Sequence, residues 1–336
     1  MLKTETRTAN DISPVERLHA LVSGDMAATD RLIHERMGST VALIPDLSRH
    51  LIDSGGKRLR PLLTLAAARL GGYKGTGHVK LAAAVEFIHT ATLLHDDVVD
   101  ESSLRRGKVS ANIVWGNKPS VLVGDFLFSR AFQLMVETGS LTVLDILAGA
   151  SAVIAEGEVM QLKSANNLGV TEEDYLRVVS AKTAALFAAA AESGAVISEQ
   201  NEERIAAMRD YGQNLGIAFQ LVDDALDYSG RQALMGKSVG DDFREAKVTL
   251  PIILAYARST DATRKFWQRA IETGPQGEAD LDRAITLVEE TGAISETMAR
   301  ARLYAGQAKK ALEIVPAEEI RSVLAAIADF CVERAY

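Results

Sequence analysis

Two aspartate clusters with the same spacing are the residues of this sequence best suited to chemistry. Both are DDxxD motifs, and their acids are Asp96, Asp97, Asp100, Asp223, Asp224 and Asp227. Residues four positions apart in a helix share one face, so the first and last acid of each motif are stacked. Each cluster ends a long apolar segment, where carboxylates need cationic partners. A solvated acidic helix end would not account for this apolar setting in both places.

The expected cation is Mg²⁺, with several ions in the site. Mg²⁺ prefers hard oxygen ligands and commonly binds a few carboxylates together with substrate phosphates. Two facing carboxylate clusters would hold such ions around one diphosphate. The ions would neutralise the leaving group, so that the C–O bond can ionise to an allylic carbocation.

A basic segment, GGKRLRP at positions 55–61, is the second informative feature. Pro61 suits the first position of a helix, and the glycines before it suit a tight turn. Lys57 and Arg60 then lie at a helix N-terminus, where backbone N–H groups also favour an anion. We interpret the segment as a diphosphate site without metal; the alternative is a solvated basic loop.

Further basic residues lie near the acids. Arg105 and Arg106 follow the first cluster and suit bidentate contacts to phosphate, although they could simply balance the charges of Asp100 and Glu101. Lys182 and its neighbour Thr183 lie in an apolar segment. A buried lysine is costly without a partner, so we expect a phosphate beside it; a snorkelling lysine is the alternative.

Four more polar residues are candidates for contacts to phosphate. His89 lies two turns before Asp96 on the same helical face, but a histidine here could equally be a core residue. Gln220 precedes Asp223 by three residues and projects beside it. Lys237 and Lys247 lie in a segment, 236–247, that we interpret as a lid over the metals; a plain surface loop is the alternative.

Composition excludes several classes of protein. The chain has 336 residues, 47% of them hydrophobic, and a net charge of −8. Such an acidic chain does not suit general nucleic-acid binding. Cys331 is the single cysteine, so no disulfide framework forms within the chain, which fits a reducing cytoplasm. The sequence shows no signal peptide and no apolar run long enough to span a membrane.

Helical periodicity runs through almost the whole chain, which predicts an all-α fold. We expect one domain over residues 1–336, a helical bundle around a central cavity, with a flexible N-terminus at 1–13. A run of small residues, 188–191, predicts close helix packing. The expected helices are 14–36, 39–53, 61–71, 78–101, 118–138, 140–164, 171–200, 201–229, 249–258, 262–272, 278–293, 295–314 and 317–333.

Together these motifs resemble the trans-isoprenyl diphosphate synthase family, specifically its long-chain polyprenyl members. The similarity runs from Gly55 to Pro251, and the order and spacing of the motifs are highly specific. It implies an all-α bundle, usually a homodimer, with the aspartate motifs facing across a cavity. The implied enzyme is a prenyltransferase that condenses isopentenyl diphosphate with an allylic diphosphate. The matching strings are GGKRLRP, HTATLLHDDVVD, RRGK, GDFLFSRAF, KT, FQLVDDALDY and GKSVGDDFREAKVTLP.

The resemblance also implies a role for each candidate residue. Asp96, Asp100 and Asp223 look like metal ligands, supported by the other acids, Asp97, Asp224 and Asp227. The allylic substrate is expected at Arg105, Lys182, Thr183 and Gln220, and isopentenyl diphosphate at Lys57, Arg60, His89 and Arg106. Lys237 and Lys247 look like lid residues that close over the allylic diphosphate.

One position departs from the family pattern. Family members often have glycine before the second lid lysine, whereas this chain has Ala246. If this position requires a positive φ, alanine is strained there. The placement of Lys247 is therefore less well defined by the resemblance than that of Lys237.

The product is expected to be long, in the octaprenyl to decaprenyl range. Ala91 and Thr92 lie one turn before Asp96, and both are small. A large aromatic residue here gives short products in the family. We expect Phe128 and Phe132 to form the floor of the cavity, although they could be ordinary core residues. The family implies that the product becomes a quinone side chain and that the enzyme contacts membranes transiently during release.

Other functions remain open at this point. A farnesyl or geranylgeranyl diphosphate synthase would share these motifs but make a shorter product. A class I terpene cyclase usually has a second metal motif that mixes Asn, Ser or Thr with Glu, and a squalene or phytoene synthase would not need GGKRLRP. An HD-type phosphohydrolase, suggested by His95 and Asp96, needs more histidines than the 6 present. A non-catalytic subunit would generally lose the aspartates.

Overall fold

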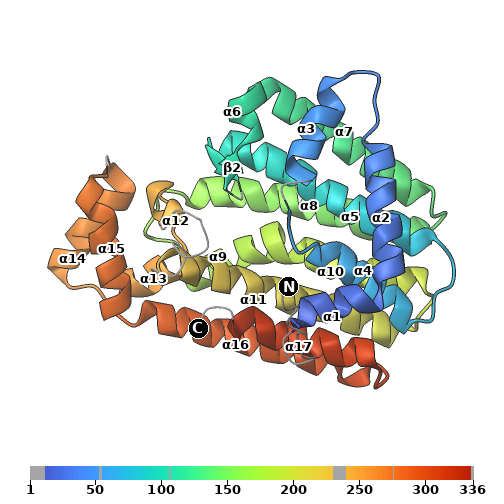
Figure 1. Cartoon of the computed structure of the whole chain (residues 1–336). Coiled ribbons are helices and arrows are strands. Elements are labelled where there is room, and N and C mark those ends of the chain that lie inside the picture. The colour runs from blue at the N-terminus through green and yellow to red at the C-terminus, as the bar shows by residue number, and fades with distance from the viewer. Residues whose placement is uncertain (1–11, 53–54, 106, 230–239, 275, 334–336) are drawn as a thin grey trace, which may run out of the picture.

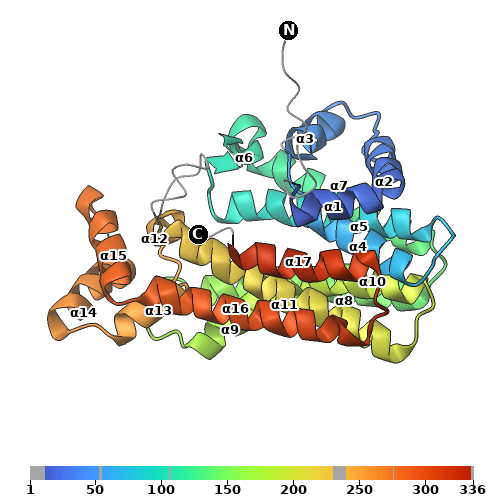
Figure 2. The same cartoon turned by 60° about the horizontal axis from the view of Figure 1, so that its bottom comes forward.

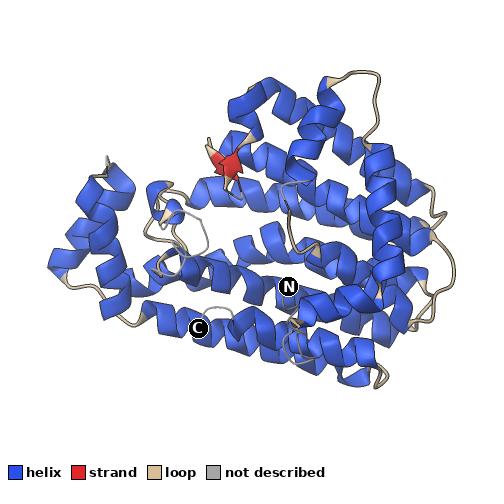
Figure 3. Cartoon of the chain, viewed as in Figure 1, coloured by secondary structure: helices blue, strands red, loops and turns tan. Residues whose placement is uncertain are grey.

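Helices make up nearly all of the structure, a computed structural model that describes residues 12–52, 55–105, 107–229, 240–274 and 276–333. Figure 3 shows a single small hairpin among the described elements, in which β1 (Leu104–Arg105) pairs antiparallel with β2 (Lys108–Val109). The prediction of an all-α fold is confirmed.

The helices divide into a long central set and shorter peripheral ones. Among the long ones, α5 is Gly77–Val99, α8 is Leu141–Ser164 and α11 is Glu202–Asp227. The others are α1 (Pro14–Leu21), α2 (Ser23–Arg36), α3 (Leu43–Ile52), α4 (Leu59–Leu70), α6 (Ala111–Trp115), α7 (Asn117–Val136), α9 (Glu172–Val179), α10 (Ala185–Ile197), α12 (Asp241–Arg244), α13 (Leu250–Ala257), α14 (Asp261–Trp267), α15 (Glu278–Glu290), α16 (Ala293–Ala311) and α17 (Glu319–Glu333).

Two apolar clusters form the core, and helix α10 belongs to both. Phe187 and Ala191 pack into the cluster that joins α10 to α4, α11, α16 and α17. Leu186 and Ala190 pack into the cluster that joins α10 to α3, α5, α7 and α8. Figures 1 and 2 show α10 among these helices, while α14 and α15 extend beyond one end of the bundle. We keep the single-domain organisation as a prediction, because a division here would cut through α10.

The small-residue run of α10 allows close packing, as expected. A Cβ atom built on Gly212 of α11 would lie 2.4 Å from the carbonyl oxygen of Phe187 and 2.7 Å from the Cα of Ala188. A larger residue at position 212 would therefore separate α10 from α11. These two helices carry Phe187 and the second aspartate motif, so their contact fixes one wall of the site described below.

Several expected boundaries were wrong. The helix predicted at 14–36 is two helices, because Val22 leaves the helical conformation with φ −117° and ψ 21°. The helix predicted at 171–200 is interrupted by a π-helical turn, Ser180–Ala184. The hairpin and the short helices α6 and α12 lie where no regular structure was predicted. Each is too short to produce a periodic pattern in the sequence.

None of the helices in the described part of the chain combines the length and the apolar character that crossing a bilayer requires.

Candidate active site

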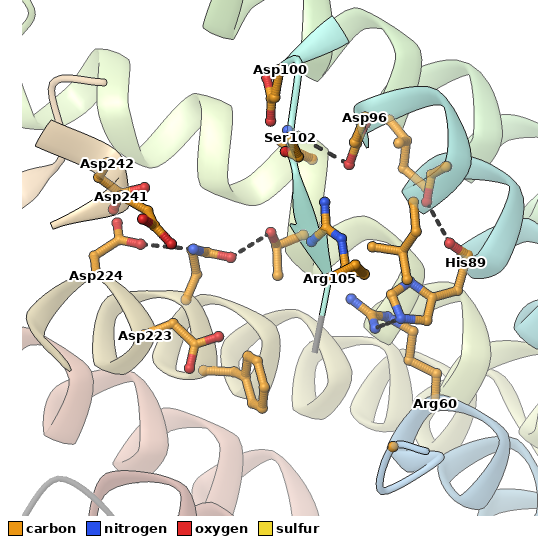
Figure 4. Close-up of a pocket in the computed structure, with 18 of the residues that line it drawn as sticks. Arg60, His89, Asp96, Asp100, Ser102, Arg105, Asp223, Asp224, Asp241 and Asp242 are labelled. Atoms are coloured by element: carbon orange, nitrogen blue, oxygen red, sulfur yellow. Dashed lines mark hydrogen bonds and ion pairs between the residues drawn. The ribbon is translucent and has the colours of Figure 1, made fainter. Parts of the chain in front are cut away.

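Both aspartate motifs line one cavity of about 610 Å³. Figure 4 shows Asp96 and Asp100 on one side and Asp223 and Asp224 on the other. The first pair comes from the end of α5 and the second from the end of α11. The arrangement that the sequence predicted, two acidic helix ends facing one space, is therefore present in the structure.

The acids of the first motif have different environments. Asp97 is fully buried and accepts a hydrogen bond of 2.8 Å from Nε of Arg105. Asp96 lines the cavity, and burial raises its pKa although Lys182 opposes the shift. Asp100 lines the cavity at the end of the helix. Asp96 and Asp100 are thus the members of this motif that face the space, while Asp97 holds Arg105.

Within the second motif, Asp224 is held by its neighbours. The hydroxyl of Tyr175 donates to its Oδ2 at 2.6 Å, and Nε2 of Gln220 donates to its Oδ1 at 2.7 Å. Thr183 in turn donates to Oε1 of Gln220 at 2.8 Å. Burial raises the pKa of Asp224 to about 7. Both oxygens of Asp224 are therefore engaged by protein groups, and Asp223 also lines the cavity, so its role as a metal ligand stays a prediction.

Asp227 anchors residues 240–242, which belong to the described part of the segment interpreted as a lid. Its carboxylate accepts hydrogen bonds from the backbone N–H groups of Asp241 and Asp242, at 3.3 and 3.1 Å. These N–H groups belong to the first residues of α12 and have no partner within that helix, so they favour a negative charge beside them. Burial raises the pKa of Asp227 to about 6, although these hydrogen bonds oppose the shift. The last acid of the motif therefore fastens the start of α12 to α11.

The cavity fits divalent cations only together with a ligand that brings oxygen atoms. Among the described side chains, no three acids, histidines or cysteines converge closely enough to hold a metal ion by themselves. Mg²⁺ commonly completes its octahedral shell with phosphate oxygens and water. Asp96, Asp100 and Asp223 supply hard oxygen ligands from two walls of one cavity. Their arrangement fits metal-bridged binding of a diphosphate.

The residues predicted to form a metal-free diphosphate site line a basic corner of the same cavity. Nη1 of Arg60 lies 3.3 Å from Nε2 of His89, and its guanidinium lies 4.3 Å from the ring centre of Phe187. Lys57 lies with its Nζ 5.1 Å from the ring centre of Phe330. The structure therefore brings Lys57, Arg60 and His89 together. Helix α4 begins at Leu59, two residues earlier than predicted, and Pro61 still falls in its first turn.

Arg58 was missed by the sequence analysis. It has a left-handed backbone conformation, with φ 47°, which a non-glycine residue rarely adopts. Its side chain compensates with two ion pairs, at 3.1 Å to Glu86 and 3.6 Å to Asp30. Arg58 thus anchors the turn between Lys57 and Arg60. The acids lie far away in the sequence, so no local signal reveals this role.

Ala246 has φ 51°, so the left-handed conformation considered for this position is present. Lys247 is nevertheless well placed, with its Nζ 2.8 Å from Oδ2 of Asp100 and also in contact with Glu245. Burial opposes the charge of Lys247, but Asp100 and Glu245 together raise its pKa. Lys247 therefore reaches the first aspartate motif despite the strained residue before it.

Lys182 lies in the cavity beside a glutamate that the sequence analysis did not select. Its Nζ is 2.7 Å from Oε2 of Glu158 and 3.8 Å from Oδ2 of Asp96. Burial, with Asp96 nearby, raises the pKa of Glu158 to about 7. The predicted partner of this partly buried lysine was a phosphate; the protein itself supplies two carboxylates. A glutamate next to Gly157 in an apolar helix was the available signal.

Three of the expected chain-length residues lie outside this cavity. Thr92 is the predicted chain-length residue that lines the cavity, among the residues the structure describes. Ala91 is fully buried in the adjoining core. Phe128 stacks on the ring of His95 at 6.0 Å, and Phe132 is 40% exposed. Neither phenylalanine lines this cavity, and Phe128 packs against the neighbouring apolar core, so their role as the floor for a long product stays a prediction.

Two predicted residues, Arg106 and Lys237, lie outside the described part of the chain. His95, which suggested a phosphohydrolase, packs against α7: Gly124 leaves so little space that a Cβ atom there would lie 2.2 Å from its Nε2. His95 is therefore directed away from the aspartates of the cavity. The structure gives no support to the phosphohydrolase alternative.

An all-helical bundle in which two DDxxD motifs and several basic side chains line one cavity defines an enzyme that acts on diphosphate esters. The chain belongs to the polyprenyl synthetase family, whose model matches residues 41–288. It is therefore a transferase of prenyl groups, as predicted.

Individual relatives support the assignment over nearly the full length. The chain is 45% identical to the octaprenyl diphosphate synthase of Escherichia coli K12, over 95% of this chain and 99% of the relative. A polyprenyl synthase from Caulobacter crescentus CB15, crystallised with calcium and isoprenyl diphosphate, is 56% identical with a TM-score of 0.94, over 98% and 100% of the chains. A decaprenyl diphosphate synthase from Rhodobacter capsulatus is 56% identical with a TM-score of 0.93. The match covers 96% of this chain and 100% of the relative. The prediction of long-chain polyprenyl diphosphate synthesis is confirmed.

Proposed function

We propose that the described cavity condenses isopentenyl diphosphate with an allylic diphosphate in a Mg²⁺-dependent reaction and releases diphosphate. The observation that carries the proposal is that Asp96, Asp100 and Asp223 line one cavity together with Lys57, Arg60 and Lys182. An acidic surface and a basic corner in one space match two anionic substrates, one bound through metal and one bound directly.

The allylic diphosphate is placed between the two aspartate motifs. Bound Mg²⁺ would neutralise the negative charge that develops on the leaving diphosphate. Arg105, Lys182 and Gln220 line the same region and can donate to its oxygen atoms. Arg105 is oriented by buried Asp97, and Gln220 is oriented by Thr183 and Asp224. Such fixed donors stabilise developing charge without reorganising during the reaction.

Isopentenyl diphosphate is placed in the basic corner, where its double bond can face the allylic carbon. Lys57, Arg60 and His89 supply donors that need no metal. The rings of Phe187 and Phe219, with centres 5.7 Å apart, line the space between this corner and Asp223. Apolar rings there exclude water from a cation that water would otherwise capture.

Substitution of the predicted metal ligands tests this assignment. We expect Asp96→Asn and Asp223→Asn each to lower kcat at least about a hundredfold, because a charged ligand to the metal-bound leaving group is lost. Asp282→Asn, on the exposed face of α15, is the control and should match the wild type. Near-normal turnover in either of the first two variants would contradict the proposed site.

The product is proposed to supply the side chain of a respiratory quinone. The support is the identity to octaprenyl and decaprenyl diphosphate synthases, together with the small residue Thr92 in the cavity wall. An apolar tail of this length favours transient contact with a membrane during release. We place the enzyme in the cytoplasm. Complementation of a strain that lacks its own long-chain synthase, followed by identification of the quinone, tests the role.

A homodimer is proposed on the basis of exposed apolar side chains on α7 and α8. Leu122, Val136 and Leu141 are 67%, 63% and 80% exposed, and Val159 is 63% exposed. Large apolar groups at this density favour burial against a second molecule. The molar mass in solution should be twice that of the chain. Val159→Glu should shift it toward the monomer, and a monomeric wild type would contradict the proposal.

A further inference from the structure

Glu158 shares one ammonium group with a predicted metal ligand. Its Oε2 accepts from Nζ of Lys182 at 2.7 Å, while Oδ2 of Asp96 lies 3.8 Å from the same nitrogen. The other oxygen of Glu158, Oε1, is buried and has no hydrogen-bond partner among the residues the structure describes. Two carboxylates thus compete for Lys182, and the shorter contact belongs to Glu158.

The backbone is built to bring this pair together. A Cβ atom on Gly157 would lie 2.7 Å from the backbone nitrogen of Lys182 and 2.9 Å from the Cβ of Ala181. Glycine therefore allows α8 to approach the helix opposite at this point. Lys182 itself lies in the π-helical turn Ser180–Ala184, and such turns occur frequently at functional sites. Both side chains consequently start from close and defined positions.

We propose that Glu158 is a positioning residue for Lys182. It holds the ammonium group toward the allylic diphosphate and keeps it away from Asp96, whose carboxylate then remains available to the divalent cation. The proposal rests on the function proposed above. Without Glu158, Lys182 would pair with Asp96 alone, and a lysine–carboxylate pair at this partly buried position would compete with the cation.

Two variants separate the reach of Glu158 from its charge. Glu158→Gln removes the charge and keeps the shape, whereas Glu158→Asp keeps the charge and shortens the side chain by one methylene. Glu192→Gln is the matched control, since Glu192 is also partly buried and pairs with an arginine, Arg209, at 3.5 Å. Thermal melting of each variant reports whether the fold is retained.

Binding should be measured directly as well as through turnover. Calorimetry would follow an unreactive thiolo analogue of the allylic diphosphate at increasing Mg²⁺ concentrations. In Glu158→Gln we expect the half-saturating Mg²⁺ concentration and the KM of the allylic substrate to rise about tenfold, as for loss of one charge-assisted hydrogen bond. The KM of isopentenyl diphosphate should stay within about twofold, because the hydrogen bond that Glu158 accepts comes from Lys182, which is assigned to the allylic substrate.

The remaining variants complete the test. Glu158→Asp should resemble Glu158→Gln in the KM of the allylic substrate, since it keeps the charge but loses the contact. In a Lys182→Gln background, Glu158→Gln should add no further change to this KM. A wild-type KM of the allylic substrate in Glu158→Asp would overturn the proposal. An equal rise in the KM of both substrates in the Glu158 variants would do the same. A wild type that binds the analogue with Mg²⁺ but does not elongate it would instead contradict the proposed function.

Discussion

Lys247 and Asp100 are 147 positions apart in the sequence, yet Nζ of the first lies 2.8 Å from Oδ2 of the second. The contact joins the end of the segment interpreted as a lid to the first aspartate motif. Asp227 binds the beginning of α12 through two backbone N–H groups. The segment 240–247 is therefore fastened to both motifs, and its geometry depends on the residue that turns the chain into Lys247.

Replacing Ala246 by glycine should stabilise the protein. Alanine at φ 51° is sterically strained, whereas glycine adopts this conformation readily. We expect the free energy of unfolding to rise by about 0.5–1 kcal/mol, since relief of strain exceeds the added flexibility of the unfolded chain. Ala20→Gly in helix α1 should instead lower the free energy of unfolding. Denaturant unfolding measures both; a destabilised Ala246→Gly would show that the turn is not strained.

Enlarging the wall beneath Asp96 should shorten the product. Thr92 lines the cavity, so a phenylalanine there would block the path of a growing chain. Ala91→Phe should act similarly, but it must also displace core neighbours because Ala91 is fully buried. Chromatography of the products should show markedly shorter chains for both variants, with Thr92→Ser as the unchanged control. Unaltered chain length in both would refute the assignment of this wall.

Stability should depend on pH in a way that metal binding reverses. Burial raises the pKa of Asp224 and of Glu158 to about 7, and that of Asp227 to about 6. A carboxyl group with a raised pKa in the folded state stabilises that state while protonated, so stability is lost as pH rises through this value. In the presence of a chelator, the metal-free protein should therefore melt at a higher temperature at about pH 6 than at about pH 8.

Adding Mg²⁺ with inorganic diphosphate should raise the melting temperature more at the higher pH, because metal binding requires ionised carboxylates. Differential scanning calorimetry at both pH values measures the two effects. Two results would contradict the charge states inferred for the cavity. One is an equal melting temperature of the metal-free protein at both pH values; the other is a larger rise in melting temperature with Mg²⁺ at the lower pH.

Tyr175→Phe should weaken the second aspartate motif without removing a charge. The hydroxyl donates to Oδ2 of buried Asp224, and its loss leaves that oxygen unsatisfied, at a cost of about 1–3 kcal/mol in unfolding free energy. The KM of the allylic substrate should rise, since Gln220 depends on Asp224, while the KM of isopentenyl diphosphate stays constant. Tyr304→Phe is the control. Wild-type stability and kinetics would show that Asp224 is held by other means.

The fold class and the principal acids follow from the sequence because their signals are local. Helical periodicity spans most of the chain, and each DDxxD motif ends a helix, so both carboxylate sets could be placed before the structure was known. The π-helical turn Ser180–Ala184 could not, since its residues continue the same apolar pattern as the helices around it. The break at Val22 has no glycine or proline at the break itself to indicate it.

Contacts between distant segments were equally beyond local reasoning. Glu158 reaches Lys182 across 24 positions, and Arg58 is anchored by acids from two other helices. Which acid of the second motif is held by a tyrosine hydroxyl depends on Tyr175, which comes from α9. Such roles are set by packing, and the sequence shows only that a charged residue in an apolar segment needs a partner.

The central claim is that this cavity elongates an allylic diphosphate with the help of divalent metal. Purified protein should be incubated with farnesyl diphosphate, labelled isopentenyl diphosphate and Mg²⁺, with and without a chelator, and the labelled product sized. We expect products in the octaprenyl to decaprenyl range, and none once the chelator is present. Cyclised hydrocarbon, release of phosphate without elongation, or chelator-resistant synthesis would contradict the account.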